Sequence, residues 1–164
     1  MDHPGTTNLL EIKTRSKLAT LYNDQSVLEH HHAASFYFMI ENTKQDSNIM
    51  ENFPQAEQVA MRKDILENIL CTDMTKHGAI QSDIKALNET IPEERDLTGK
   101  NKRTIVKALV HASDISNVSR PFDIAKNWAE RTIKEFFHQG DKEKALGLDI
   151  SMLCDRHTTN FAKS

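Results

Sequence analysis

The spacing of apolar residues predicts helices along most of this chain. From Pro54 to about Asn88 apolar residues recur every three or four positions, which is the period of an amphipathic helix. The same period predicts four further helices, at residues 9–22, 26–40, about 101–114 and 119–140. No segment alternates apolar and polar residues as a half-buried strand does. We therefore expect an all-α fold of about five or six helices, in a domain that covers residues 1–164.

Polar and breaker residues predict where these helices begin and end. Ser26-Val27-Leu28-Glu29 has the Ser-x-x-Glu form of a capping box, which starts a helix. Gly78 is expected to bend the long segment 54–88, and Gly140 to stop the last helix. Residues 42–52 and 90–100 are polar and are expected to be loops.

Two apolar faces are expected to form the core. The first lies on the helix at 26–40 and consists of Leu28, Phe36, Met39 and Ile40. The second is a stripe on the last helix, made of Ala125, Trp128, Ala129, Ile133, Phe136 and Phe137. Asp73 and His77 are four residues apart and are expected to pair on a helix surface.

Composition narrows the class of protein. With 38% hydrophobic and 27% charged residues, the 164-residue chain has the composition of a soluble globular protein. The net charge of −3 and the lack of a basic block argue against a nucleic-acid partner. No apolar run reaches membrane-spanning length, and the N-terminus does not resemble a signal peptide. Because the 2 cysteines lie far apart in sequence, we expect no disulfide framework and an intracellular, cytosolic location.

The stretch from Val110 to Asn117 is the first candidate for chemistry. His111 and Asp114 are three residues apart, so they share a face of a helix. Asp and His are common ligands of divalent metals. Taken alone, however, the stretch favours a helix C-terminal region in which Asp114, Ser116 and Asn117 satisfy backbone groups.

A second candidate comes from the spacing Glu-x-x-His, which occurs at Glu29/His32 and at Glu135/His138. Two such pairs, with a Glu from each of two further helices, form the dinuclear carboxylate site of ferritin-like bundles. Glu135 and His138 project away from the apolar stripe of their helix, which disfavours this alternative. A non-catalytic helical interaction domain is the other alternative.

Six blocks carry longer motifs, and their order along the chain is informative. They read Met-Asp-His-Pro-Gly-x-x-Asn at 1–8, Tyr-Asn-Asp-x-Ser-Val-Leu-Glu at 22–29, Thr-Asp-Met-x-Lys-His at 72–77, Ser-Asp-Ile-Ser-Asn at 113–117, Glu-Phe-Phe-x-Gln-Gly-Asp at 135–141 and Ser-x-x-Cys-Asp at 151–155. Together they resemble the class I 3′,5′-cyclic-nucleotide phosphodiesterase catalytic domain from end to end of the chain. His30, Ser113, Val118 and Met152 depart from the usual residues of these motifs, and none of the four is a proposed ligand.

The resemblance implies a multi-helical, HD-like fold and a reaction. The family hydrolyses cyclic AMP or cyclic GMP to the nucleoside 5′-monophosphate with two divalent metal ions, zinc and magnesium or manganese. Carried over by position, Asp114 is a metal ligand. His3, Glu29 and Thr72 would hold metal-bound waters, and the substrate pocket would include Met74, Ile115, Asn117 and Phe136. The motifs do not separate cyclic AMP from cyclic GMP, because the base-contacting Gln of the family falls outside them.

The resemblance also implies that the chain is the central fragment of the catalytic domain. The family's other metal ligands and its general acid would lie upstream of Met1, and the Gln directly after Ser164. Because metal sites use about three protein ligands, we expect the chain alone to be inactive. Apolar faces built to pack on the flanking helices of the same domain should also make it aggregation-prone.

Overall fold

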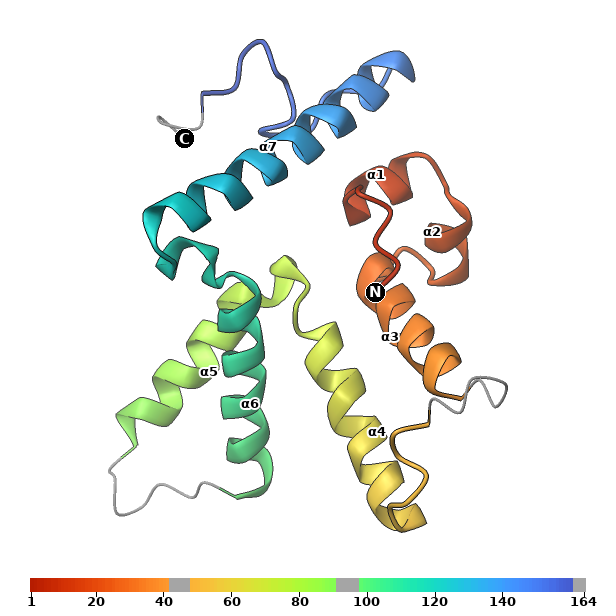
Figure 1. Cartoon of the computed structure of the whole chain (residues 1–164), viewed down its shortest axis with the longest axis vertical. Coiled ribbons are helices and arrows are strands. Elements are labelled where there is room, and N and C mark those ends of the chain that lie inside the picture. Colours follow the sequence, from red (N-terminus) through yellow and green to blue (C-terminus); the bar gives the residue numbers. More distant parts are fainter. Residues whose placement is uncertain (42–47, 91–97, 161–164) are drawn as a thin grey trace. The chain divides into compact units, whose positions relative to one another are not determined.

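The computed structural model describes residues 1–41, 48–90 and 98–160 (Figure 1). Within these ranges every regular element is a helix. The α-helices are α1 (Asn8–Lys13), α2 (Lys17–Leu21), α3 (Val27–Ile40), α4 (Gln55–Leu70), α5 (His77–Glu89), α6 (Gly99–Asp114) and α7 (Phe122–Ala145). Two short 3-10 helices, η1 (Met74–Lys76) and η3 (Ser116–Ser119), connect them. The all-α prediction is confirmed. The predicted loops lie partly outside the described residues.

The chain forms two compact units, and each is described by itself. Unit 1 comprises Met1–Asp2 and Leu28–Ile115, and unit 2 comprises His3–Val27 and Ser116–Ser164. Unit 1 therefore contains most of α3 and all of α4, η1, α5 and α6, whereas unit 2 contains α1, α2, η3 and α7.

The core of unit 1 lies between α3 and α4. It is built on Tyr37, Ile40 and Met50, and the partly buried Phe36, Met61, Ile65 and Leu66 pack against it. The predicted core residue Met39 is 47% exposed, whereas Tyr37 is 6% exposed. Helical geometry explains the correction, because Tyr37 lies one turn before Ile40 on the inward face and Met39 does not.

The long helical segment is broken before the predicted bend. Helix α4 ends at Leu70, and α5 begins at His77, so Gly78 lies inside the first turn of α5. The carboxylate of Asp73 accepts hydrogen bonds from the backbone N and the hydroxyl of Thr75, at 2.9 and 2.8 Å. These local bonds compete with continued helix and explain the break.

The N-terminal segment also contains a break that the apolar pattern did not predict. The expected helix at 9–22 is two helices, because Arg15 adopts a φ of 49° and Ser16 caps α2 by accepting from the backbone N of Ala19 at 3.1 Å. Helix α3 begins beside Ser26, as predicted. Ser26, however, has a φ of 39°, which differs from the extended conformation of a helix N-cap.

Gly140 serves close packing and does not end α7, which continues to Ala145. A Cβ built on Gly140 would lie 2.0 Å from the carbonyl oxygen of Cys154. Only a residue without a side chain lets the C-terminal segment cross the helix there. The predicted apolar stripe is correspondingly shifted: Trp128 is 49% exposed, and the buried residues of α7 are Gln139, Gly140 and Glu143.

A buried carboxylate joins three segments of unit 2. Glu143 is fully buried and accepts from the backbone N and the hydroxyl of Ser151, at 2.6 and 2.5 Å, and from the side-chain amide of Gln139 at 3.3 Å. Lys13 lies 3.8 Å away. Gln139 in turn accepts from the backbone N of Thr7 at 2.8 Å. Burial raises the pKa of Glu143, but the hydrogen bonds from Ser151 and Gln139 and the charge of Lys13 outweigh it and lower the pKa below its usual value.

We predict that Gly140→Ala lowers the free energy of unfolding by about 1–3 kcal/mol or more, because backbone must move to admit the methyl group. Urea unfolding of the 164-residue chain measures the change. Gly78→Ala is the matched control: nothing lies within 4 Å of its built Cβ, so helix propensity should raise stability by about 0.5–1 kcal/mol. Equal effects at both positions would contradict the packing found here.

Stability should also fall in acid because of Glu143. Its pKa is lowered on folding, so its contribution is full above the unfolded carboxyl pKa and is lost as pH falls through the folded value. We expect Glu143→Gln to cost about 1–3 kcal/mol at pH 7 and to make urea midpoints less pH-dependent below about pH 4.5. The exposed Glu130→Gln should change neither quantity measurably. An unchanged pH dependence in Glu143→Gln would refute this account.

Candidate functional site

Asp114 is the last residue of α6 and is exposed to solvent. Helix α6 packs against both α5 and α4 in unit 1, and Figure 1 shows α5 and α6 side by side. Most of the apolar run that precedes Asp114 is half-buried by this packing, although Leu109 is 62% exposed, and the carboxylate of Asp114 is exposed. An exposed carboxylate at a helix end keeps its oxygens available to a ligand.

Thr72 and Met74 belong to the connection between α4 and α5. The hydroxyl of Thr72 donates to the carbonyl of Ile69 at 2.8 Å, and the side chain of Met74 is 57% exposed. The neighbouring Cys71 thiol reaches the carbonyl of Lys107 on α6 at 3.6 Å. This connection is thus attached to the helix that carries Asp114.

A second contact joins the same two segments. Nδ1 of His77, the first residue of α5, lies 2.8 Å from Nε2 of His111 on α6. His111 is 4% exposed. The predicted surface pairing of Asp73 with His77 is wrong in its location, because Asp73 is only 5% exposed and bonds to Thr75.

Glu29 lies in the first turn of α3 and is half-buried. The two N-terminal residues of unit 1 run beside this helix. His31 Nε2 lies 2.8 Å from a carboxylate oxygen of Asp2, and His32 Nδ1 lies 2.5 Å from the carbonyl oxygen of Met1. These two histidines therefore hold the N-terminal residues against α3.

Unit 2 contains three of the predicted site residues. His3 is exposed, and its Nδ1 accepts from the backbone N of Gly5 at 3.0 Å. Phe136 is half-buried on α7. Asn117, on η3, donates from Nδ2 to the carbonyl of Ala125 at 3.0 Å. Because a carbonyl only accepts, this bond fixes the amide, and the buried Oδ1 of Asn117 has no hydrogen-bond partner in the part of the chain that is described.

Asp114 suits one position of a metal site, since carboxylate oxygens are common ligands. In residues 1–41, 48–90 and 98–160, no group of three or more His, Cys, Asp or Glu side chains could hold a metal ion. The described residues by themselves therefore do not complete a metal centre.

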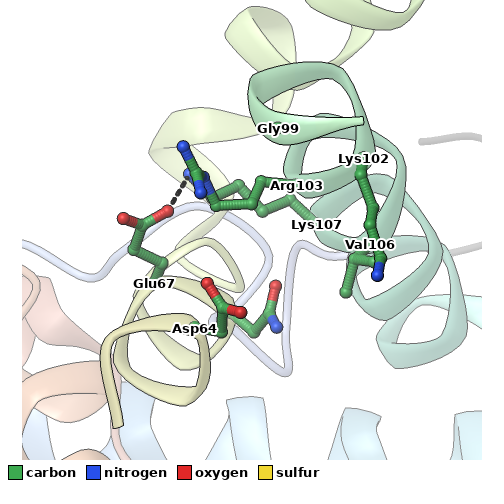
Figure 2. A pocket seen from close by; sticks show the side chains of 8 residues that line it. Asp64, Glu67, Gly99, Lys102, Arg103, Val106 and Lys107 are labelled. Atoms are coloured by element: carbon green, nitrogen blue, oxygen red, sulfur yellow. Dashed lines mark ion pairs between the residues drawn. The ribbon is translucent and has the colours of Figure 1, made fainter. Parts of the chain in front are cut away.

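A separate cavity of about 250 Å³ lies in unit 1 between α4 and α6 (Figure 2). Its lining residues are Asp64, Glu67, Asn68, Gly99, Lys102, Arg103, Val106 and Lys107. Glu67 and Lys107 form an ion pair at 2.8 Å, drawn as the dashed line in Figure 2, and the hydrogen bond from Lys107 lowers the pKa of Glu67. None of the predicted site residues lines this cavity, and the ion pair ties α4 to α6.

Comparison with known proteins assigns the family. The family model for 3′5′-cyclic nucleotide phosphodiesterase matches residues 1–164. The chain is 36% identical over 173 residues to rat 3′,5′-cyclic-AMP phosphodiesterase 4C, and the alignment covers 100% of this chain and 31% of the rat protein. It is equally similar to the mouse 4C protein and to isoform F of the Drosophila melanogaster 3′,5′-cyclic-AMP phosphodiesterase, of which it covers 24% and 25%. This all-helical chain belongs to the 3′5′-cyclic nucleotide phosphodiesterase family, and it spans less than a third of the length of these relatives.

The family assignment confirms the resemblance found in the sequence and replaces the ferritin-like alternative. Among the described helices, none combines the length and apolar character needed to cross a bilayer. The individual roles assigned to the site residues stay predictions.

Sequence reasoning missed the contact between His77 and His111. The spacing of four residues pairs His77 with Asp73, whereas its partner in the structure is 34 residues away. The available signal was that His77 ends the motif at 72–77 and His111 lies two residues before the motif at 113–117.

Proposed function

We propose that this chain is part of a catalytic domain that hydrolyses 3′,5′-cyclic nucleotides to nucleoside 5′-monophosphates, with cyclic AMP as a substrate. The family match supports the reaction, and the similarity to cyclic-AMP phosphodiesterases of rat, mouse and Drosophila supports cyclic AMP. At the level of single residues, the proposal rests on the position of Asp114. Its carboxylate stands at the solvent-exposed end of a helix whose preceding turns are packed.

Two divalent metal ions, zinc with magnesium or manganese, belong to this proposal. Asp114 would be one ligand, and further ligands are needed, because no group of three or more His, Cys, Asp or Glu side chains among the described residues could hold a metal ion. His3, Glu29 and Thr72 would act around the ions through hydrogen bonds, which orient ligands and waters. Bound divalent ions would supply charge neutralisation at the phosphoester and an activated water.

The base of the substrate would contact both polar and apolar side chains. The buried Oδ1 of Asn117 is a free acceptor in the described structure, and it suits an N–H group on a purine. Met74 and Ile115 are 57% and 41% exposed, so their apolar side chains are available to cover a planar ring. Phe136 contributes an aromatic face.

The role of Asp114 can be tested in a chimera. The 164-residue chain replaces the matching residues of rat cyclic-AMP phosphodiesterase 4C, so that the flanks come from the host. We expect the chimera to hydrolyse cyclic AMP and Asp114→Ala to lower kcat/KM by about a thousandfold or more, as loss of a group acting at the reacting centre does. The measurement is AMP release, with the chain alone assayed beside it.

Asp149→Ala is the control for Asp114→Ala. Asp149 is an exposed carboxylate whose backbone carbonyl accepts from Lys13, so removing its side chain should leave kcat/KM unchanged. Circular dichroism and a melting curve establish that each chimera is folded. A folded, active chimera that tolerates Asp114→Ala would exclude the proposed role, and a folded but inactive chimera in both the rat and the Drosophila host would exclude the proposed function.

Asn117 should act mainly on substrate binding. Asn117→Ala removes the acceptor proposed for the base, and we expect KM for cyclic AMP to rise by about tenfold, corresponding to roughly 1.4 kcal/mol, with a smaller effect on kcat. Steady-state kinetics of the chimera measures both constants. Asn127→Ala, an exposed position on α7, should leave KM unaltered. A fall in kcat alone would show that Asn117 does not bind substrate in the ground state.

A further inference from the structure

The contact between His77 and His111 links two of the segments of unit 1 that carry predicted site residues. His77 follows Thr72 and Met74 at the start of α5, and His111 lies one helical turn before Asp114 at the end of α6. The two ring nitrogens are 2.8 Å apart, and the ring centroids are 5.1 Å apart. We propose that His77 and His111 are positioning residues, whose hydrogen bond fixes the end of α6 against the connection at 72–77.

The surroundings of His111 determine which of its two ring nitrogens carries the proton. Its Nδ1 is buried and has no hydrogen-bond partner in the described structure. A buried N–H without an acceptor is rarer and more costly than a bare lone pair. His111 therefore carries its proton on Nε2 and donates it to Nδ1 of His77.

Burial makes the loss of the hydrogen bond between His77 and His111 costly. His111 is 4% exposed, so water does not replace a lost partner readily. The thiol of Cys71 also reaches α6, at the carbonyl of Lys107, one turn further from Asp114 than His111. The histidine pair is thus the contact nearer to the functional end of α6.

The consequence for catalysis rests on the proposed function. If Asp114 acts at the reacting centre, a displacement of about 1 Å at the end of α6 can cost about a hundredfold in rate. Asn117 and Phe136 belong to unit 2, which this hydrogen bond does not include. Met74 and Ile115, by contrast, lie in the two segments that the bond joins, so its loss should lower kcat by more than it raises KM for cyclic AMP, which should change by no more than about threefold.

The test compares variants that break the bond with variants that keep it. His111→Leu and His77→Leu remove the donor and the acceptor while retaining apolar volume. His111→Gln places an amide N–H near the position of Nε2, and His77→Asn places a carbonyl oxygen near the position of Nδ1. In the chimera we expect each Leu variant to lose about tenfold or more in kcat with KM within about threefold, and the Gln and Asn variants to stay within about threefold of the unmutated chimera.

A double variant distinguishes the loss of one shared hydrogen bond from two independent effects on activity. If the two rings act through one bond, His77→Leu combined with His111→Leu should lose no more activity than the more damaging single change. Leu variants that retain kcat, or Gln and Asn variants that lose as much as Leu, would overturn the proposal. An active unmutated chimera beside fully active Leu variants would refute only this inference, whereas an inactive unmutated chimera refutes the proposed function.

A second readout needs no activity and uses the 164-residue chain itself. Nitrogen NMR of 15N-histidine-labelled protein identifies the tautomer of each ring. We expect His111 to be protonated on Nε2, and we expect this signature to shift in His77→Leu. Protonation of His111 on Nδ1, or a His111 signal that is insensitive to His77→Leu, would contradict the hydrogen bond even if a Leu variant proves too unstable for kinetics.

Discussion

Unit 2 is organised around the buried carboxylate of Glu143, which needs hydrogen-bond donors from the protein because water does not reach it. Glu143 has no exposed surface, and isolated burial of a charge is far more costly than any single contact can offset. The chain surrounds it with donors from Ser151 and Gln139 and the ammonium of Lys13. These donors come from α1, α7 and the C-terminal segment, so the arrangement of unit 2 follows from the requirement to satisfy one side chain.

Asp114 has the opposite environment, which fits the ligand role proposed for it. Its helix is packed on α5 and α4, but its carboxylate is exposed to solvent in the described structure. A carboxylate that holds a fold together is poorly suited to bind a ligand, because its lone pairs are occupied. One that stands free at the end of a packed helix is held in place by its neighbours and remains available. Tertiary contacts on α6, at His111 and Lys107, provide that placement.

Much of the fold and of the family assignment could be predicted from the sequence. Helical periodicity located α3, α4, α6 and α7, although in α7 the residues that are buried are Gln139, Gly140 and Glu143 and not the apolar stripe. It failed where short polar side chains act locally: Asp73 and Ser16 cap new helices inside segments that otherwise have helical spacing. It failed at Gly140 for another reason, since a glycine that stops a helix and one that admits a crossing backbone look alike in sequence.

Only those residues of the candidate site that belong to the motifs could be predicted from the sequence. Six ordered blocks identify the family, and they indicate Asp114 and Asn117 by position. They do not indicate which buried groups lack partners, such as Oδ1 of Asn117, or that His77 meets His111. The histidine contact depends on the packing of α5 against α6, and the environment of Asn117 depends on the packing of η3 against α7. Local spacing in the sequence does not relate these residues.

The central claim is that this chain supplies part of the machinery for hydrolysis of a cyclic phosphodiester. The most direct measurement is a 31P NMR time course of cyclic AMP with the chimera built on the rat relative. The account predicts that the cyclic phosphodiester signal is replaced by the signal of 5′-AMP. Persistence of the cyclic signal in the presence of folded chimera, or its conversion to 3′-AMP, would contradict it.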